Sequence, residues 1–270
     1  MKITGKVVLV TGGGSGIGRN LVMELVKRGA EVAAVDINED ALKETVALAG
    51  ELGEKISTYV VNIANREAVE ALPEKVIARH GRIDGIINNA GIIQPFVRIN
   101  DLDYDVMERV VNVNLWGPIY MTKSFLPYLL ERPEAHIVNV SSMGGFFPFP
   151  GQTMYGATKA GVKLFTEGLY AELKDTNVNV TVVFPGAINT NITKNSGVER
   201  EAPAAENAEA GANRALPADQ AAKIILDGME KDKYNVFVGS DAKMMDVMYK
   251  LNPKGAVGFI TKQMSGLIAD

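Results

Sequence analysis

The sequence predicts a fold of the α/β class, with a doubly wound parallel sheet of about seven strands and helices on both faces. Short runs of β-branched and other apolar residues alternate with helix-length segments along most of the 270-residue chain, which is typical of βαβ units. These runs are almost continuously apolar, as in strands that helices cover on both faces. Several helical segments stop at a glycine, a residue that commonly ends helices.

The expected elements follow one another in a regular order. The seven expected strands are Val7–Val10, Val32–Val35, Ser57–Val61, Ile83–Asn88, His136–Val140, Val178–Phe184 and Asn235–Val238. Three of the helical segments between them end before a glycine, and they are Leu21–Arg28, Glu39–Leu52 and Arg66–His80. Because no linker interrupts this alternation before residue 190, we expect one domain over residues 1–270.

Composition and charge exclude several classes of protein. The formal net charge is -4 and the chain has no cysteine, which argues against a dedicated nucleic-acid binder, a disulfide framework and a thiolate metal site. The two histidines, His80 and His136, lie in unrelated segments, so we expect no metal site and place each at the surface or at a helix end. No secretion signal precedes the first strand, and no run of about 18 apolar residues could span a bilayer. We therefore expect a soluble, cytoplasmic protein without a transmembrane segment.

A glycine-rich loop follows the first strand. The segment TGGGSGIG, Thr11–Gly18, holds five glycines in eight residues and leads into a helical pattern near Gly16. At the carboxyl end of a parallel strand, the free N–H groups of a helix N-terminus bind anions such as a pyrophosphate. Gly12 would then permit the tight turn, Gly16 the close approach of the phosphate, and Gly18 the packing of the helix on the strand. The loop predicts a Rossmann-like dinucleotide site, but by itself it could also serve only a tight turn.

The second strand ends in Asp36, 18 residues after Gly18. An acidic side chain at this place accepts hydrogen bonds from the ribose hydroxyls of an adenosine. Its charge would repel a 2′-phosphate, and no arginine or lysine lies in the glycine loop or immediately after Asp36 to pair with one. The sequence therefore favours NAD over NADP. The competing interpretation is that Asp36 only caps the next helical segment.

Three further motifs occur later in the chain: NNAG at 88–91, NVSSMGG at 139–145 and YGATK at 155–159. With the glycine loop, Asp36, Asn114 and the pair Pro185-Gly186, they resemble the short-chain dehydrogenase/reductase family in its single-domain form. The order and spacing of the motifs are those of the family, strongly over residues 6–184 and loosely beyond. Together these motifs are highly specific, whereas a tyrosine and a lysine at this spacing alone would be common by chance.

The YGATK motif has a chemical reason. A tyrosine with a pKa of about 10 is a poor acid and base at neutral pH unless its phenolate is stabilised. On a helix, Tyr155 and Lys159 lie four residues apart and share a face, so the lysine ammonium can lower the pKa of the tyrosine. The resemblance implies that Tyr155 is the catalytic acid/base and that Lys159 also binds the nicotinamide ribose.

The resemblance assigns two further catalytic positions. Ser142 lies 13 residues before Tyr155, which is the separation found in the family, so we prefer it to Ser141 as the donor to the substrate oxygen. Asn114 matches the asparagine that in the family holds a water molecule connecting to the lysine. Asn112 lies in the same helix but off the matching position.

The resemblance also implies a set of cofactor contacts. Asn62 and Ile63 match the pair that brackets the adenine, and Asn88 opens NNAG, where the chain passes beneath the cofactor. The loop after the sixth strand would hold the nicotinamide carboxamide. The expected cofactor site comprises Gly12, Ser15, Gly16, Ile17, Gly18, Asp36, Asn62, Ile63, Asn88, Ala90, Tyr155, Lys159, Pro185, Gly186, Ile188 and Thr190.

Two segments bear on the substrate. The insert 191–215 is small, polar and poor in bulky apolar residues, so we expect a mobile substrate lid, with a disordered surface loop as the alternative. The segment GGFFPFPG at 144–151 holds three phenylalanines, and in the family this loop forms one wall of the substrate pocket. An aromatic wall without a cation favours a bulky, mainly apolar secondary alcohol or ketone. Alternatively, these phenylalanines pack in the core or in a dimer contact.

The C-terminal tail, residues 239–270, departs from the family. Many relatives end in an aspartate-glycine-glycine segment that builds a tetramer interface, whereas this chain continues with a methionine stripe at 244–251 that Pro253 ends. We therefore expect a homodimer through the long helices around Asn114 and Tyr155, and the tetramer is in doubt. The stripe is explained most simply by core packing, although thioethers also suit hydrophobic ligands and partners.

The function that these residues predict is an NAD(H)-dependent interconversion of a secondary alcohol and a ketone, with Tyr155 as the acid/base. Extended sugar epimerases are disfavoured because they carry a G-x-x-G-x-x-G loop and a larger C-terminal domain. Enoyl reductases are disfavoured because they space the tyrosine and lysine more widely. The alternative from another class is a sensor or scaffold that binds NAD without turnover.

Overall fold

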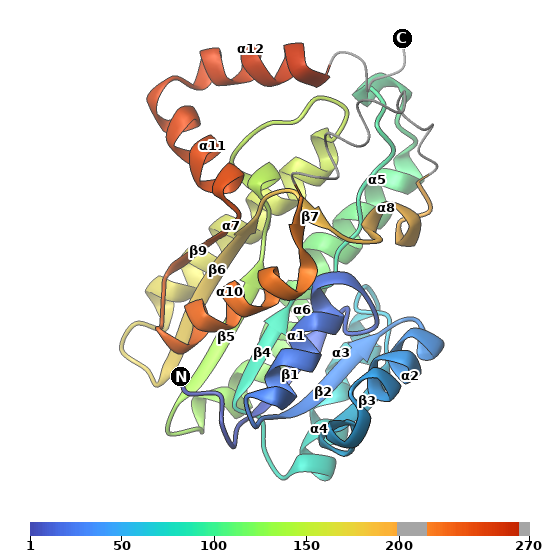
Figure 1. Cartoon of the computed structure of the whole chain (residues 1–270), viewed down its shortest axis with the longest axis vertical. Helices are drawn as coiled ribbons and strands as arrows, with labels where there is room; N and C mark the ends of the chain where they lie inside the picture. The colour runs from blue at the N-terminus through green and yellow to red at the C-terminus, as the bar shows by residue number, and fades with distance from the viewer. Residues whose placement is uncertain (199–214, 265–270) are drawn as a thin grey trace.

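Seven parallel strands form a single sheet in the order β3-β2-β1-β4-β5-β6-β9 in the computed structural model, which describes residues 1–198 and 215–264 (Figure 1). The strands are β1 (Val7–Thr11), β2 (Glu31–Asp36), β3 (Ile56–Val60), β4 (Gly85–Asn88), β5 (Ala135–Val140), β6 (Val178–Pro185) and β9 (Asn235–Val238). The order runs outward from β1 in one direction and from β4 in the other, so the predicted doubly wound, Rossmann-like α/β fold is confirmed. Each expected strand is present, with ends shifted by at most two residues.

The helices alternate with the strands along the chain. They are α1 (Gly16–Lys27), α2 (Glu39–Leu48), α3 (Arg66–Glu70), α4 (Leu72–His80), α5 (Tyr104–Val111), α6 (Gly117–Leu130), α7 (Thr153–Glu172), α8 (Ile192–Asn195), α10 (Ala218–Glu230), α11 (Ser240–Leu251) and α12 (Pro253–Met264). The shorter elements are the 3₁₀ helices η1 (Gly50–Lys55), η2 (Ile99–Asp101) and η4 (Met143–Gly145), the π-helix η3 (Asn112–Trp116), and a small sheet of β7 (Ile188–Asn189) with β8 (Leu216–Pro217).

Alternate residues of each strand face opposite sides of the sheet, and helices bury both sides. Val8 and Val10 of β1 belong to a core that includes residues of α1 and α10, which lie in front of the sheet in Figure 1. Val7 and Leu9 belong to a second core with residues of α4, α6 and α7. All four side chains are buried, and burying a side chain of this size stabilises the fold by about 1.5–3 kcal/mol.

Two expected helices end earlier than the sequence pattern suggests. The segment Arg66–His80 forms two helices, α3 and α4, because Pro73 in the first turn of α4 has no N–H to continue an earlier helix. The segment Glu39–Leu52 is helical only to Leu48, and a 3₁₀ turn follows from Gly50. Gly50 has φ +57°, a conformation that favours glycine and leaves the right-handed helix.

His136 corrects an expectation about the histidines. It lies within β5 and its side chain is fully buried, whereas the sequence suggested a position at the surface or a helix end. The burial is tolerated because Nε2 of His136 lies 2.8 Å from Oγ1 of Thr181, on the neighbouring strand β6. His80 is the last residue of α4, as expected, but its side chain is also almost fully buried.

The C-terminal helices extend beyond the carboxyl ends of the strands, at the top of Figure 1. Met245 and Met248 of α11 pack with Phe147, so part of the methionine stripe is core, whereas Met244 and Leu251 are exposed. Most of the expected lid, at 199–214, and the last residues of the tail, at 265–270, lie outside the described residues. None of the helices in the described part of the chain is long and apolar enough to cross a membrane.

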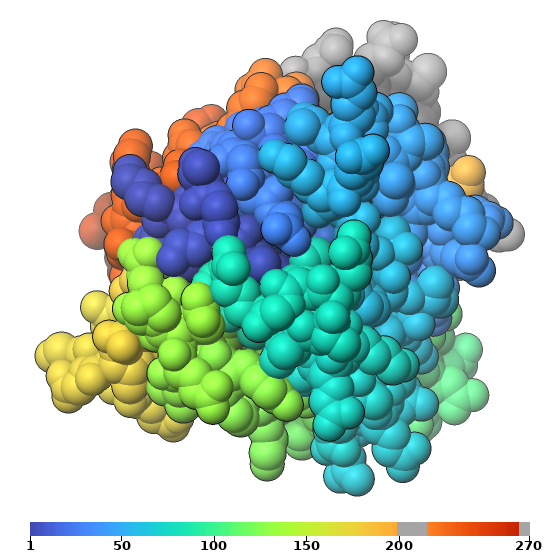
Figure 2. Space-filling model, turned by 90° about the horizontal axis from the view of Figure 1, so that it is seen from below, coloured from blue at the N-terminus to red at the C-terminus, as the bar shows by residue number. Residues whose placement is uncertain are grey.

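The opposite end of the molecule carries the N-terminus and the turns that lead into the strands. Figure 2 shows this end as a continuous surface, with the N-terminal residues beside the segments that precede β4 and β5. The amino group of Met1 forms ion pairs with Asp232 and Glu134 there.

Candidate active site

A cavity of about 850 Å³ lies at the carboxyl ends of the central strands. It is lined by the loop after β1, by the end of β2, and by the segments after β3, β4, β5 and β6. The strand order reverses between β1 and β4, and ligands of doubly wound sheets bind in the crevice that forms at such a point. The fold therefore places this cavity where the sequence predicts a dinucleotide.

The glycine loop forms a cradle on one side of this cavity. Gly12 and Gly16 have φ of +71° and +51°, which favour glycine. A Cβ at Gly12 would lie 2.9 Å from the side-chain nitrogen of Asn89, and one at Gly18 would overlap the carbonyl of Gly12. The N-cap residue of α1, Ser15, makes no side-chain cap, so the first N–H groups of α1 are free to bind an anion. The loop thus fits a pyrophosphate.

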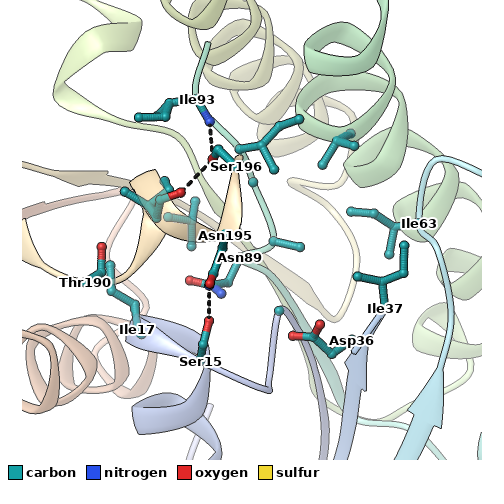
Figure 3. A pocket seen from close by; sticks show the side chains of 18 of the residues that line it. Ser15, Ile17, Asp36, Ile37, Ile63, Asn89, Ile93, Thr190, Asn195 and Ser196 are labelled. Atoms are coloured by element: carbon teal, nitrogen blue, oxygen red, sulfur yellow. Dashed lines mark hydrogen bonds between the residues drawn. The ribbon is translucent and has the colours of Figure 1, made fainter. Parts of the chain in front are cut away.

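Most of the residues predicted for the cofactor line the cavity. Figure 3 shows Asp36 and Ile63 on one side of it and Thr190 and Ile17 on the other. The predicted residues among the cavity lining are Gly12, Ser15, Gly16, Ile17, Asp36, Asn62, Ile63, Ala90, Tyr155, Lys159, Pro185, Gly186, Ile188 and Thr190. Gly18 is not among the lining residues, and it lies so close to the backbone of Gly12 that no side chain fits there.

Tyr155 and Lys159 lie in the first two turns of α7 and face the same cavity. The Lys159 ammonium lies 5.9 Å from the centre of the Tyr155 ring and donates a 3.0 Å hydrogen bond to the carbonyl of Val140. Burial lowers the pKa of Lys159 to about 8. Burial also raises the pKa of the Tyr155 phenol, and a hydrogen bond with Ser142 acts in the opposite direction. At neutral pH, the pair therefore consists of a protonated phenol and a nearby cation.

Two consecutive serines follow β5, and their hydroxyls have different partners. Ser141 is buried and donates a 2.7 Å hydrogen bond to the carbonyl of Lys159. Ser142 lines the cavity, accepts the N–H of Gly144 at 3.0 Å and lies beside Tyr155. Because Ser142 accepts this bond, Gly144 does not use the hydroxyl proton, which can be donated to Tyr155 or to a ligand. The geometry therefore suits Ser142, and not Ser141, to hydrogen-bond a substrate oxygen.

Asn114 is buried behind the cavity rather than in its lining. Its side chain accepts the N–H of Ile92 and donates to the carbonyl of Ile92, each at 2.8 Å, and also donates to Oγ1 of Thr158. A Cβ at Gly91 would meet both Asn114 and Lys159, at 3.3 and 3.2 Å. The π-helix η3 brings Asn114 close to Lys159. Asn112, which the sequence places off the matching position, lines the cavity.

Asn88 does not contact the cavity, and the prediction that it does is wrong in this respect. As the last residue of β4, it points toward the core, where its side-chain amide donates to Asn139 at 2.8 Å and to Thr122 at 3.2 Å. The following residue, Asn89, lines the cavity and donates to the carbonyl of Thr11 at 3.0 Å. The alternation of side chains along β4 explains the exchange.

The described part of the insert lies across the cavity. Asn195, at the end of α8, donates a 2.8 Å hydrogen bond to the hydroxyl of Ser15 in the glycine loop (Figure 3). The hydroxyl of Ser196 accepts the N–H of Ile93 at 2.9 Å, and the carbonyl of Ser196 accepts from Arg109 at 3.2 Å. The segment after β6 is thus bonded to both sides of the cavity.

The phenylalanine-rich segment does not line the large cavity. Among the described residues of that lining, none comes from 144–151. Phe147 is fully buried and packs with Ala256 and Ile260 of α12, and the segment borders a second cavity of about 420 Å³ together with Tyr249. The expected aromatic wall is therefore wrong for the cavity that contains Tyr155, because α11 and α12 supply an apolar surface on which the segment packs. The alternative, core packing, describes Phe147.

Several lining residues were not predicted from the sequence. Ile37 and Asn38 directly follow Asp36, so their place in the cavity could have been predicted from the end of the second strand. Arg109 of α5 reaches the cavity only through tertiary packing, and no local motif marks it, whereas Ser196 lies within the predicted lid at 191–215.

Comparisons with known proteins show the family of this chain. The family model of the short chain dehydrogenases matches residues 6–201. SadH of Mycobacterium tuberculosis, named as an oxidoreductase, is 38% identical over 252 residues, which cover 92% of this chain and 91% of SadH.

Two solved structures have the same fold. A short-chain dehydrogenase/reductase from Burkholderia phymatum in complex with NAD has a TM-score of 0.81 at 24% identity, covering 93% of this chain and 96% of that one. A short-chain dehydrogenase from Burkholderia cenocepacia in complex with NADP has a TM-score of 0.79 at 25% identity, covering 96% and 99%. The chain belongs to the short-chain dehydrogenase family of oxidoreductases, whose members bind a nicotinamide cofactor.

Proposed function

We propose that this protein is an NAD(H)-dependent oxidoreductase that interconverts a secondary alcohol and a ketone. The observation that carries the proposal is the presence of Ser142, Tyr155 and Lys159 in the same cavity as the glycine loop and Asp36. A proton donor and a dinucleotide cradle within one cavity are what carbonyl reduction by a nicotinamide requires.

In the reductive direction, bound NADH would supply a hydride to the carbonyl carbon. Tyr155 then donates its phenolic proton to the carbonyl oxygen, while Ser142 donates a hydrogen bond to the same oxygen as charge develops. The Lys159 ammonium stabilises the phenolate that remains, because it lies close to the Tyr155 ring. The same groups act in reverse order when an alcohol is oxidised.

The preference for NAD over NADP is inferred from Asp36. Its carboxylate lines the cavity at the end of β2, where it would accept bonds from a ribose and repel a 2′-phosphate. Arg19, which directly follows the glycine loop, is bonded to Glu44, Thr45 and the carbonyl of Gly14. Because Arg19 is held by these groups, it is not oriented to pair with a phosphate.

The substrate is inferred to be a mainly apolar secondary alcohol or ketone. This substrate class is supported by Ile92, Ile93 and Ile192, which line the cavity, and not by the phenylalanine segment. Apolar surface of this kind favours an apolar ligand by about 25 cal/mol per Å² removed from water. Arg109 lines the cavity too, but its guanidinium donates to the carbonyl of Ser196.

A homodimer remains our proposal for the assembly. Trp116 of η3 and Leu164 and Tyr170 of α7 are large apolar side chains that are exposed in the single chain. They lie on the two long helical segments that the sequence identified as the dimer face. Burial of such residues between two copies is typical of homodimer interfaces.

The test is a panel of ketones graded by size and polarity, assayed with NADH and NADPH by the loss of reduced-nicotinamide absorbance. We expect turnover of apolar ketones with NADH and weaker activity with NADPH. Best turnover on a small polyol or sugar would contradict the proposed substrate class. Tight binding of NADH with no turnover across the panel would instead favour a sensor or scaffold.

A further inference from the structure

Gln94 connects the segment after β4 to the helix that carries Tyr155. Its side chain is completely buried. Oε1 of Gln94 accepts hydrogen bonds from the backbone N–H groups of Met154, at 2.8 Å, and of Tyr155, at 3.0 Å. These N–H groups belong to the first turn of α7, which begins at Thr153. A residue remote in sequence therefore caps the catalytic helix.

The helix has no cap of its own. The first N–H groups of any α-helix lack partners within the helix, and a side chain at the N-cap position usually accepts from one of them. In α7 the N-cap residue is Gln152, which makes no such bond. Without Gln94, the part-buried N–H groups of Met154 and Tyr155 would lose the partner that the structure gives them, and an unsatisfied donor away from water destabilises the fold.

The orientation of the Gln94 amide is fixed from both sides. Its Nε2 donates to the carbonyl of Gly151 at 3.0 Å, so Oε1 must face the helix. In return, Nε2 of Gln152 donates to the backbone carbonyl of Gln94 at 2.8 Å. The bonds form a closed clamp between the segment after β4 and the start of α7.

Three consecutive residues of that segment each bind a different part of the site. Ile92 is held through both its N–H and its carbonyl by Asn114 of η3. The N–H of Ile93 donates to the hydroxyl of Ser196, at the end of α8. Gln94 binds the N–H of Tyr155. The position of Tyr155 is thereby tied to the same short segment that contacts the insert.

We propose that Gln94 is a positioning residue that sets the place of the Tyr155 hydroxyl relative to Ser142 and the substrate carbonyl. It does not touch the reacting atoms, and it acts by fixing the first turn of α7. This inference rests on the proposed reductase function. Misplacement of a reacting group by about 1 Å is enough to cost about 100-fold in rate.

The test compares two substitutions. Gln94→Leu removes both acceptor contacts, and we expect kcat for ketone reduction to fall about 10- to 100-fold, with the ketone KM and the NADH dissociation constant little changed. Gln94→Glu keeps an acceptor oxygen facing the N–H groups of Met154 and Tyr155, although it loses the donor to Gly151, and it should recover most of kcat. Its added negative charge raises the pKa of nearby titratable groups, Lys159 included, so the basic limb that Lys159 sets should move to higher pH.

Asn65→Ala is the matched control. Asn65 caps α3 by accepting the N–H of Ala68 at 3.0 Å, and it lies outside the cavity lining. It should lower the unfolding temperature through loss of a helix cap while leaving kcat and the pH profile unchanged. A merely structural role for Gln94 predicts the same behaviour for its own substitutions.

A direct readout of the contact is amide hydrogen exchange. The N–H groups of Met154 and Tyr155 should exchange faster in Gln94→Leu than in the unaltered protein, and Gln94→Glu should restore their protection. Unchanged exchange in Gln94→Leu, or a kcat within twofold of the unaltered enzyme, would overturn the proposal. If the unaltered protein reduces no ketone, the proposed function fails, and the exchange rates still decide whether Gln94 holds the helix.

Discussion

The backbone N–H of Gly14 donates a 2.9 Å hydrogen bond to Oδ2 of Asp36, which ties the glycine loop to the end of β2. The second oxygen, Oδ1, accepts the N–H of Asn38 at 3.0 Å. A side chain at position 14 would collide with the carboxylate, since a Cβ there would lie 2.9 Å from Oδ2. The orientation of Asp36 is therefore set before any ligand binds.

With this orientation, the Asp36 carboxylate alone should determine the preference for NADH over NADPH. Replacing Asp36 with alanine should weaken NADH binding and narrow the preference over NADPH, because both the ribose acceptor and the repulsion of a 2′-phosphate are lost. Steady-state kinetics with each cofactor provide the measurement. Asp36→Asn, which retains the shape and one acceptor oxygen, separates the effect of the charge. A preference of the unaltered protein for NADPH would show that Asp36 has been misinterpreted.

The pKa of Lys159 predicts the basic limb of the reaction. Its ammonium is charged below a pH of about 8 and is lost above it, while the pKa of Tyr155 is raised by burial and the phenol stays protonated. We expect kcat/KM for ketone reduction to fall as the pH rises through about 8. Lys159→Arg keeps its charge to much higher pH, so its residual activity should lack this limb. A limb that stays at the same pH in Lys159→Arg would assign it to another group.

Buried His136 predicts a loss of stability in mild acid. Burial lowers its pKa, against the opposing influence of Asp232 and Glu134 and with the aid of the nearby Met1 amino group. A base whose folded pKa lies below its unfolded pKa of about 6.5 binds a proton more readily in the unfolded chain. Stability is therefore complete above that pH and falls as the pH decreases below it.

The measurement is the thermal unfolding midpoint across this range. His136→Gln keeps a donor toward Thr181 and removes the titration, so its midpoint should fall less than that of the unaltered protein between about pH 7 and pH 5. Asp232 does not confound the comparison, because His136 and the Met1 amino group hold the pKa of Asp232 at about 2. Equal losses in the two proteins would exclude His136 as the cause.

The parts of the fold that local patterns encode were predictable. Most residues of β1 and β2 are apolar, so the burial of these strands follows from their own sequence. The glycine loop and Asp36 lie where the two strands end. Tyr155 and Lys159 share a helix face by spacing alone. All of these features depend on residues that are close together in the sequence, so one sequence is enough to predict them.

The remaining features depend on tertiary packing. Asn88 and Asn89 are adjacent asparagines of the NNAG motif, and the motif does not show which of them lines the cavity. That depends on the direction of each side chain at the end of β4. The packing of Phe147 on α12 and the capping of α7 by Gln94 join residues far apart in sequence. Contacts between residues so far apart in sequence leave no pattern in the local sequence from which they could be predicted.

In the proposed reaction, Tyr155 transfers the proton and does not serve mainly to bind the cofactor. The most direct measurement is the rate of ketone reduction by Tyr155→Phe, together with its NADH affinity from a fluorescence titration. We predict a rate lowered about 10²–10⁴-fold, as is typical for loss of a general acid, with NADH affinity within a few-fold of the unaltered protein. A rate within tenfold of the unaltered enzyme would contradict it.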